Sequence, residues 1–225
     1  MRICHCFGLS SAMLLGFVMW QVALRHYVAN ELGMVLLTFG FLLLLGDLAL
    51  ANWGGAPQAI PAPYPFDGPI EVGSLRFPAY RAALLIAGLA SAGFLWWLID
   101  GTRTGVLVRA AVNDAQMAEG LGVNVSRITA GVFSLSAGLS GMAGVLGGPL
   151  IGVYPGADLT VLLLAIVVVV LGGLGSLKGA FLASLIVGLL DTAGRSFFPQ
   201  ASLFAVFAPM ALILIIKPSG LMGRT

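Results

Sequence analysis

Long runs of apolar residues, several of them close to 20 residues in length, are the feature that most constrains this chain. A helix that crosses the hydrocarbon core of a bilayer needs about 20 mostly apolar residues, because its backbone polar groups must be satisfied within the helix. Six runs reach or approach that length, and they cover residues 32–52, 81–99, 128–151, 159–174, 179–193 and 203–216. We therefore predict an all-α polytopic membrane protein.

The composition agrees with a lipid environment and excludes one class of partner. Charged residues make up 9% of the chain and hydrophobic residues 59%, whereas a soluble domain carries about 25% charged residues. The net charge of +2 is too small for a nucleic-acid surface, and basic residues do not gather with aromatic ones. We expect a lipid bilayer, and no nucleic acid, around this chain.

Residues 7–24 form a further apolar run that follows Arg2. A signal peptide would end in a small-x-small cleavage site, but Val22, Ala23 and Leu24 end in a large residue. We favour an additional membrane helix, which gives a bundle of about six to seven transmembrane segments. Small residues in the 128–151 run recur at near-helical spacing, which favours close helix packing in lipid. They are Ala137, Gly141 and Gly144, and Ser136, Ser140 and Gly144.

The distribution of Lys and Arg predicts the orientation of the bundle. With residues 101–127 in the cytoplasm, seven basic residues lie inside and four outside, and the C-terminus is cytoplasmic. Residues 53–80 then form an extracytoplasmic loop with six prolines and four glycines. So many prolines exclude a regular helix. We interpret the loop as an ordered, extended cap, and a flexible linker is the alternative.

The chain offers little for catalysis or metal binding. Cys4, His5 and Cys6 could supply three metal ligands, but a closed zinc site needs four. His5 and His26 are the two histidines, and no catalytic set can be assembled around the membrane core. The glycine-rich stretch 172–179 is not a nucleotide loop, because Lys178 precedes Gly179 rather than Ser or Thr. We expect no enzyme activity and no metal or cofactor in this chain.

Two acidic residues lie within or near the apolar runs. Asp47 either faces a translocation path or caps a helix near the interface. Asp191 precedes Arg195 by four residues, which predicts an ion pair along one helix. Other ionisable groups are sparse in the membrane runs, whereas proton- or sodium-coupled transporters bury such groups. The energy for transport would therefore come from elsewhere.

Residues 109–127 are the polar exception in this apolar chain. We predict a short cytoplasmic helix that Asn113 caps, with Gln116 at the third position reaching back. Gly120 and Gly122 would end the helix. Met117 and Leu121 would share one face, framed by Asp114 and Glu119, and could dock into a groove of a partner. A solvated loop between two membrane spans is the alternative.

The stretch QMAEGLG, residues 116–122, resembles the cytoplasmic coupling motif of ABC-importer permeases: Glu-Ala-Ala, three further residues, then Gly. Gln and Met replace the motif's Glu and first Ala. The stretches GVLVRAAVNDAQMAEGLGVNVSRI, VVLGGLGSLKGAFLASLIVGLLD, LILIIKPSGLMGR and QVALRHYVANELGMVLLTFGFLLLLGDLALANWG resemble permeases of branched-chain amino acid importers, the LivH-like group above all. The resemblance covers about residues 22–224, while residues 1–21 do not resemble the family's opening helices, so we expect the chain to lack them.

The resemblance implies an assembly and a set of site residues. Residues 1–225 would form a single permease domain, in which 53–80 is the extracytoplasmic loop and 101–127 the cytoplasmic coupling loop. Its partners would be a second, LivM-like permease, two cytoplasmic ABC ATPase subunits that bind ATP and Mg, and an extracytoplasmic binding protein. The ATPase-coupling residues would be Asp114, Gln116, Met117, Ala118, Glu119 and Gly122. Candidate residues of the translocation path are Asp47, Gly172, Gly173 and Gly175, with helix packing as the alternative for the glycines.

The implied setting is the bacterial cytoplasmic membrane, and the implied substrate is leucine, isoleucine or valine. Three alternatives stay open at this point. The substrate could be urea, a short amide or another amino acid. The chain could be a secondary transporter that works without an ATPase, or a truncated membrane remnant that transports nothing.

Overall fold

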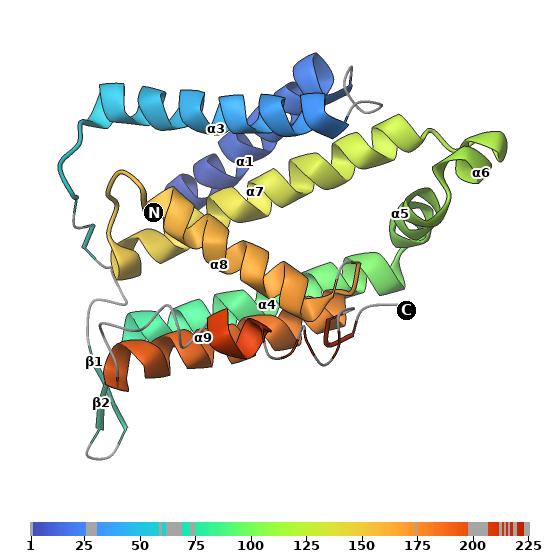
Figure 1. Cartoon of the computed structure of the whole chain (residues 1–225). Coiled ribbons are helices and arrows are strands. Elements are labelled where there is room, and N and C mark those ends of the chain that lie inside the picture. The colour runs from blue at the N-terminus through green and yellow to red at the C-terminus, as the bar shows by residue number, and fades with distance from the viewer. Residues whose placement is uncertain are drawn as a thin grey trace. The chain divides into compact units, whose positions relative to one another are not determined.

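The computed structural model describes residues 2–25, 31–58, 60–61, 69–72, 75–173, 175–197, 207–211, 213, 215, 217 and 220–222. Apart from one two-stranded hairpin, the regular structure in these residues is helical (Figure 1). The chain divides into two compact units, Met1–Pro155 and Gly156–Thr225.

Unit 1 contains most of the helices. Its elements in chain order are α1 (Arg2–Met19), the π-helix η1 (Trp20–Leu24), α3 (Glu31–Trp53), β1 (Pro69–Val72), β2 (Leu75–Pro78), α4 (Ala79–Gly101), α5 (Arg103–Asn113), α6 (Ala115–Gly120) and α7 (Val125–Ile151). Unit 2 contains α8 (Ala157–Gly172) and α9 (Leu177–Phe197).

The apolar runs of the sequence become helices, as predicted. Among the described residues, four helical segments are long and apolar enough to cross a membrane: Leu32–Trp53, Ala79–Gly101, Val125–Ile151 and Leu177–Phe197. They match the predicted spans at 32–52, 81–99, 128–151 and 179–193 to within a few residues. The shorter apolar helices Ser10–Val22 and Ala157–Gly172 correspond to the runs at 7–24 and 159–174. Residues 207–211 are helical, and much of the predicted span 203–216 lies outside the described residues.

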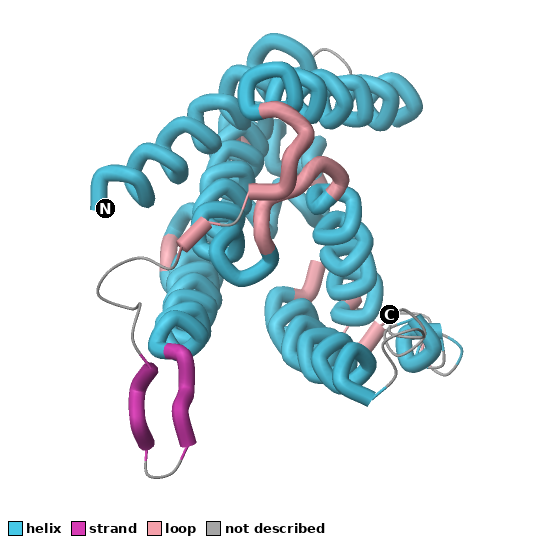
Figure 2. Tube along the Cα trace, turned by 90° about the vertical axis from the view of Figure 1, so that its left-hand side faces the viewer, coloured by secondary structure: helices cyan, strands magenta, loops and turns pink. Residues whose placement is uncertain are grey.

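The loop between α3 and α4 contains a hairpin that the sequence analysis did not predict. β1 and β2 pair antiparallel, with Pro69 opposite Pro78 (Figure 2). Both prolines lie at strand ends, where the missing N–H costs few of the hydrogen bonds between the two strands. Earlier in the loop, Gln58 pairs with Val153, the second residue after α7, with N···O distances of 2.8 and 3.1 Å. These described parts of the loop are extended, and its role as a cap stays a prediction.

α1 and α7 lie side by side and form the main helix contact of unit 1 (Figure 1). The Ser134 hydroxyl donates to the Met13 carbonyl oxygen at 2.9 Å. A Cβ added to Gly16 would lie 2.5 Å from the Cβ of Ala137, so the two backbones approach closely. The buried small residues of α7 are Ala130, Ser134, Gly138 and Gly148. Small-residue packing was therefore predicted correctly, and Ala137 takes part in it, whereas the predicted Ser136, Ser140 and Gly144 are exposed.

Unit 2 is built on a helical hairpin of α8 and α9. Val167 and Leu171 of α8 pack with Ala183 and Val187 of α9 in a buried apolar cluster. Residues near the C-terminus return to this hairpin. The Leu221 amide donates to the Leu171 carbonyl oxygen at 2.8 Å, and the Met222 amide donates to that of Gly172 at 3.2 Å. These bonds satisfy carbonyls at the C-terminal end of α8 that have no partner within the helix.

The long helix α4 separates two features of unit 1. β2 ends where α4 begins, and α5 follows one residue after α4 ends. With a rise of about 1.5 Å per residue, the 23 residues of α4 extend over roughly 35 Å, enough for the hydrocarbon core of a bilayer. The hairpin and the polar α5–α6 segment therefore lie at opposite ends of one membrane-spanning helix (Figure 1).

Candidate coupling site

The polar segment begins with a tight elbow between α4 and α5. Thr102, the one residue between the two helices, caps α5 by accepting a hydrogen bond from the Gly105 amide at 3.2 Å. Its hydroxyl also donates to the Leu98 carbonyl oxygen of α4. Gly105 is buried, and an added Cβ there would lie 2.6 Å from the carbonyl carbon of Ile99. Only glycine allows α5 to start this close to the end of α4.

A second link across the elbow comes from Arg109. One guanidinium nitrogen, Nη1, lies 2.7 Å from Asp100 Oδ1 and 2.8 Å from the Ile99 carbonyl oxygen. Both side chains are about half exposed, at 44% for Arg109 and 49% for Asp100. The positive charge also lies beside C-terminal carbonyls of α4, where a helix end favours a cation. Arg109, Asp100 and Thr102 were not predicted as site residues from the sequence.

A short helix, α6, follows α5, as predicted, but its cap differs from the prediction. Asp114 is the N-cap, and its Oδ1 accepts a hydrogen bond from the Met117 amide at 2.9 Å. Asn113, the predicted cap, is still helical and ends α5. Asp114 has extended dihedrals (φ −153°, ψ 96°), which a capping residue requires, and its own amide donates to Ala110 of α5. One residue therefore ends α5 and begins α6.

The predicted stop of α6 at its glycines is confirmed. Gly120 is the last helical residue, and Gly122 has φ +83°. The Gly122 amide donates to the Glu119 carbonyl oxygen at 2.9 Å, and the Val123 amide donates to that of Ala118 at 3.1 Å. This pair of bonds is a Schellman motif, which needs a residue in the left-handed region that glycine adopts without strain.

The six predicted coupling residues divide into two groups by exposure. Ala118 is buried at 3% exposure, and it lies where α6 packs against α5 and α7. Met117 and Leu121 are 65% and 79% exposed. The side chains of Asp114, Gln116 and Glu119 are also exposed, as is Gly122. α6 and its C-cap thus expose two large apolar side chains, Met117 and Leu121, close to exposed charged residues.

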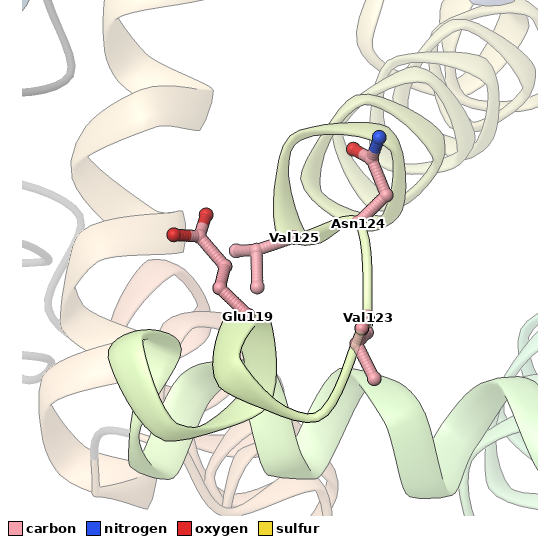
Figure 3. A pocket seen from close by; sticks show the side chains of 5 residues that line it. Glu119, Val123, Asn124 and Val125 are labelled. Atoms are coloured by element: carbon pink, nitrogen blue, oxygen red, sulfur yellow. The ribbon is translucent and has the colours of Figure 1, made fainter.

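An open depression lies at the corner between α6 and α7 (Figure 3), and its lining residues are Glu119, Gly122, Val123, Asn124 and Val125. The side chains of Glu119 and Val125 lie next to each other, while the Asn124 side chain points away from Glu119. Asn124 caps α7, since its Oδ1 accepts from the Arg127 amide at 3.0 Å. An Asn directly before an apolar run is a cap signal that the sequence analysis could have used.

The candidate path residues occur in both units. Asp47 belongs to α3 in unit 1 and is exposed, and no hydrogen bond or ion pair of its side chain occurs among the described residues. Gly172 and Gly173 of unit 2 are buried, and Gly175 is exposed with φ +83°. A Cβ on Gly172 would lie 2.6 Å from the Ala180 amide nitrogen. Close backbone packing explains Gly172, and its role in a path stays a prediction.

The other residues of interest lie apart from the coupling segment. The predicted pair of Asp191 and Arg195 forms, with Arg195 Nε 3.0 Å from both carboxylate oxygens. Cys4, His5 and Cys6 are part of α1, and His26 lies outside the described residues. Within the described part of the chain, no three or more His, Cys, Asp or Glu residues gather as metal ligands would.

Comparisons with known proteins agree on one family. The family described as "Branched-chain amino acid transport system / permease component" matches residues 3–216. The chain is 29% identical over 218 residues to the high-affinity branched-chain amino acid transport system permease protein LivH of Escherichia coli (strain K12), covering 93% of this chain and 70% of that protein.

Two further relatives carry similar names. BraD, a high-affinity branched-chain amino acid transport system permease protein of Pseudomonas aeruginosa, is 35% identical over 128 residues, which are 56% of this chain and 42% of BraD. LivH of Salmonella typhimurium is 31% identical over 159 residues, which are 70% of this chain and 52% of that protein. No solved structure matches the chain.

Proposed function

Because this chain belongs to the permease family of branched-chain amino acid ABC transporters, we propose that it forms part of the membrane path for leucine, isoleucine and valine in an ATP-driven importer. As a member of this family it is a multi-pass membrane protein and not itself an enzyme. The named substrates follow the relatives, whose names describe high-affinity branched-chain amino acid transport. In this proposal residues 1–225 act as a single permease domain.

The proposed assembly contains the partners that drive and supply transport. A second permease of the LivM-like kind completes the path, and two cytoplasmic ATPase subunits bind ATP and Mg. An extracytoplasmic binding protein delivers the amino acid. The scarcity of ionisable residues in the membrane helices supports an external energy source, because ion-coupled transporters bury such groups along the path. We also propose the bacterial cytoplasmic membrane, with the C-terminus in the cytoplasm, since Lys and Arg are more frequent on that side.

One observation carries the proposal: Met117 of α6 and Leu121 at its C-cap are exposed apolar side chains beside the exposed charges of Asp114 and Glu119. Large exposed apolar side chains framed by charges are typical of a docking surface for another protein. A helix with an apolar face suits a groove of matching shape, and the ATPase subunit is the partner we propose. In this role the coupling helix and its two ends are formed by six residues: Asp114, Gln116, Met117, Ala118, Glu119 and Gly122.

The geometry also suits a part that transmits movement. α6 has both ends fixed by hydrogen bonds, at Asp114 and at Gly122. It connects through α5 to α4 and directly to α7, both long enough to cross the membrane. A closure of the ATPases would displace α6, and α4 and α7 would follow as rigid bodies. Asp47 and the glycines at 172, 173 and 175 remain our candidates for the path that these movements open.

The test is transport by the reconstituted complex. The chain is expressed with the second permease and the ATPase subunits, placed in vesicles, and supplied with binding protein and labelled leucine. We expect uptake that needs ATP and that isoleucine and valine inhibit, whereas urea does not. Uptake without ATP, or no association with an ATPase, would contradict the proposal.

A single substitution examines the docking surface. Met117→Asp places a charge on the exposed apolar pair and should reduce binding of the ATPase subunits. Asn113→Asp is the matched control, because it adds the same charge close by with almost no change in shape. Membrane insertion should be unchanged in both variants. Equal ATPase binding by the two variants would argue against α6 as the docking element.

A further inference from the structure

The elbow between α4 and α5 is held by three separate interactions. Thr102 joins the two helices through its hydroxyl, which accepts from Gly105 and donates to Leu98. Gly105 brings the backbone of α5 against Ile99. Arg109 then reaches back across the elbow to Asp100 and the Ile99 carbonyl oxygen, nine and ten residues earlier in the chain.

Arg109 lies at a mechanically sensitive place. Thr102 is the one non-helical residue between α4 and α5, and Asp114 is the one between α5 and α6. Residues at element ends absorb changes in backbone dihedrals when parts of a protein move. The Thr102 and Gly105 contacts hold the first turn of α5, whereas Arg109 makes its contacts from the seventh residue of the helix. It therefore resists a change in the angle between α4 and α5.

The other arginine of α5 provides a contrast. Arg103 is exposed and begins the same helix, and within the described part of the chain its side chain has no hydrogen bond or ion pair. A general need for positive charge on α5 would be met by either residue. Of the two arginines, Arg109 makes the hydrogen bonds to Asp100 and to the Ile99 carbonyl oxygen. This difference makes the angle of the elbow, rather than charge, the property that Arg109 controls.

We propose that Arg109 is a positioning residue that fixes α5 against the end of α4, so that displacement of α6 moves α4 instead of bending the chain at Thr102. The inference rests on the proposed function, because it concerns how the coupling helix passes on its movement. The hydrogen bonds of the Arg109 side chain go to Asp100 and Ile99 of α4, and within the described residues none goes to α6. Its loss should leave ATPase binding intact and lower the amount of amino acid transported per ATP hydrolysed.

The main measurement is the ratio of leucine uptake to ATP hydrolysis in reconstituted vesicles. We expect Arg109→Ala to lower this ratio about two- to fivefold, the range over which a half-exposed ion pair biases an equilibrium. Arg103→Ala removes the same charge from the same helix and should leave the ratio unchanged. Arg109→Lys, which keeps one charged donor, should restore part of the ratio. If Arg109→Ala does not insert into the membrane, the ratio measured for Arg109→Lys still tests the proposal.

A second measurement examines the elbow itself. Cys4 and Cys6 are replaced by serine, and spin labels are attached to cysteines at Leu89 of α4 and Val112 of α5, both exposed. The distribution of distances between the labels should broaden in Arg109→Ala and stay narrow in Arg103→Ala. An unchanged distribution together with an unchanged transport ratio would overturn the proposal. So would equal effects of the two alanine substitutions.

The two proposals fail in different ways. If the unsubstituted complex shows no ATP-dependent uptake, the proposed function is wrong, and the label distances alone decide whether Arg109 holds the elbow. If uptake is coupled normally and Arg109→Ala changes neither measurement, the proposed function stands and the role of Arg109 is refuted. Loss of ATPase binding in Arg109→Ala would also refute it, because the residue would then belong to the docking surface.

Discussion

The N-cap of α6 allows a quantitative test of how the coupling segment is held. The Asp114 carboxylate accepts one hydrogen bond from the Met117 amide at 2.9 Å. Replacing such a cap by alanine costs about 1 kcal/mol in helix stability. α6 has six residues, so few backbone bonds resist its opening. We expect Asp114→Ala to destabilise the helix locally without unfolding the membrane helices on either side.

The size of the effect follows from the helix–coil equilibrium. A loss of about 1 kcal/mol raises the population of the opened segment about fivefold, since a factor of ten corresponds to about 1.4 kcal/mol. Amide hydrogen exchange of the purified protein measures this population directly. The amides of Leu121, Gly122 and Val123 report on α6, because their acceptors are Met117, Glu119 and Ala118. Their exchange should accelerate about fivefold in Asp114→Ala.

A conservative substitution separates the cap from the charge. Asn is about as good an N-cap as Asp, because its side-chain oxygen accepts the same hydrogen bond. Asp114→Asn should therefore exchange nearly as slowly as the unsubstituted protein. If Asp114→Asn and Asp114→Ala accelerate exchange equally, the charge and not the cap stabilises α6. If neither variant changes the exchange of these amides, the reasoning from the Met117 bond is refuted.

Two further predictions concern packing and orientation. Gly172→Ala should lower the free energy of unfolding by about 1–3 kcal/mol, since the added Cβ meets the Ala180 backbone at 2.6 Å. Gly188→Ala, where an added Cβ has nothing within 4 Å, should be neutral or stabilising, and equal midpoints in thermal unfolding would contradict the packing argument. In a chain without Cys4 and Cys6, a cysteine at Gln116 should react with a membrane-impermeant maleimide from the cytoplasmic side. A cysteine at Gln58 should react from outside, and the reverse labelling would overturn the orientation.

The sequence by itself determined the features that depend on one stretch of chain. The apolar runs predict helices such as α3 and α4 because a bilayer imposes a minimum length on every apolar segment. Gly120 and Gly122 predict the end of α6, since the left-handed turn requires glycine at that point. The spacing of Asp191 and Arg195 also predicts their ion pair, because residues four apart lie on the same face of one helix.

The exact boundary of a helix was harder to predict where two neighbouring residues could both serve as its cap. Asn113 and Asp114 are both good capping residues, and the sequence analysis chose the wrong one. An N-cap residue has non-helical backbone dihedrals, so the choice between the two depends on where α5 ends. Asp114 has extended dihedrals and is the cap, whereas Asn113 still belongs to α5. The hairpin β1–β2 was missed for a similar reason. Prolines excluded a helix there, but the pairing of two four-residue strands depends on contacts between them.

Only the tertiary structure decided the contacts between elements. Arg109 reaches Asp100 because α5 turns back at Thr102, and nothing in a nine-residue spacing predicts that. Likewise, α7 buries Ala130, Ser134 and Gly138 and leaves the predicted Ser136, Ser140 and Gly144 exposed, because the position of α1 selects the face. Gly172 meets Ala180 only when α8 and α9 pack together. Spacing along the chain fixes which residues share a face of a helix, whereas helix packing fixes what that face meets.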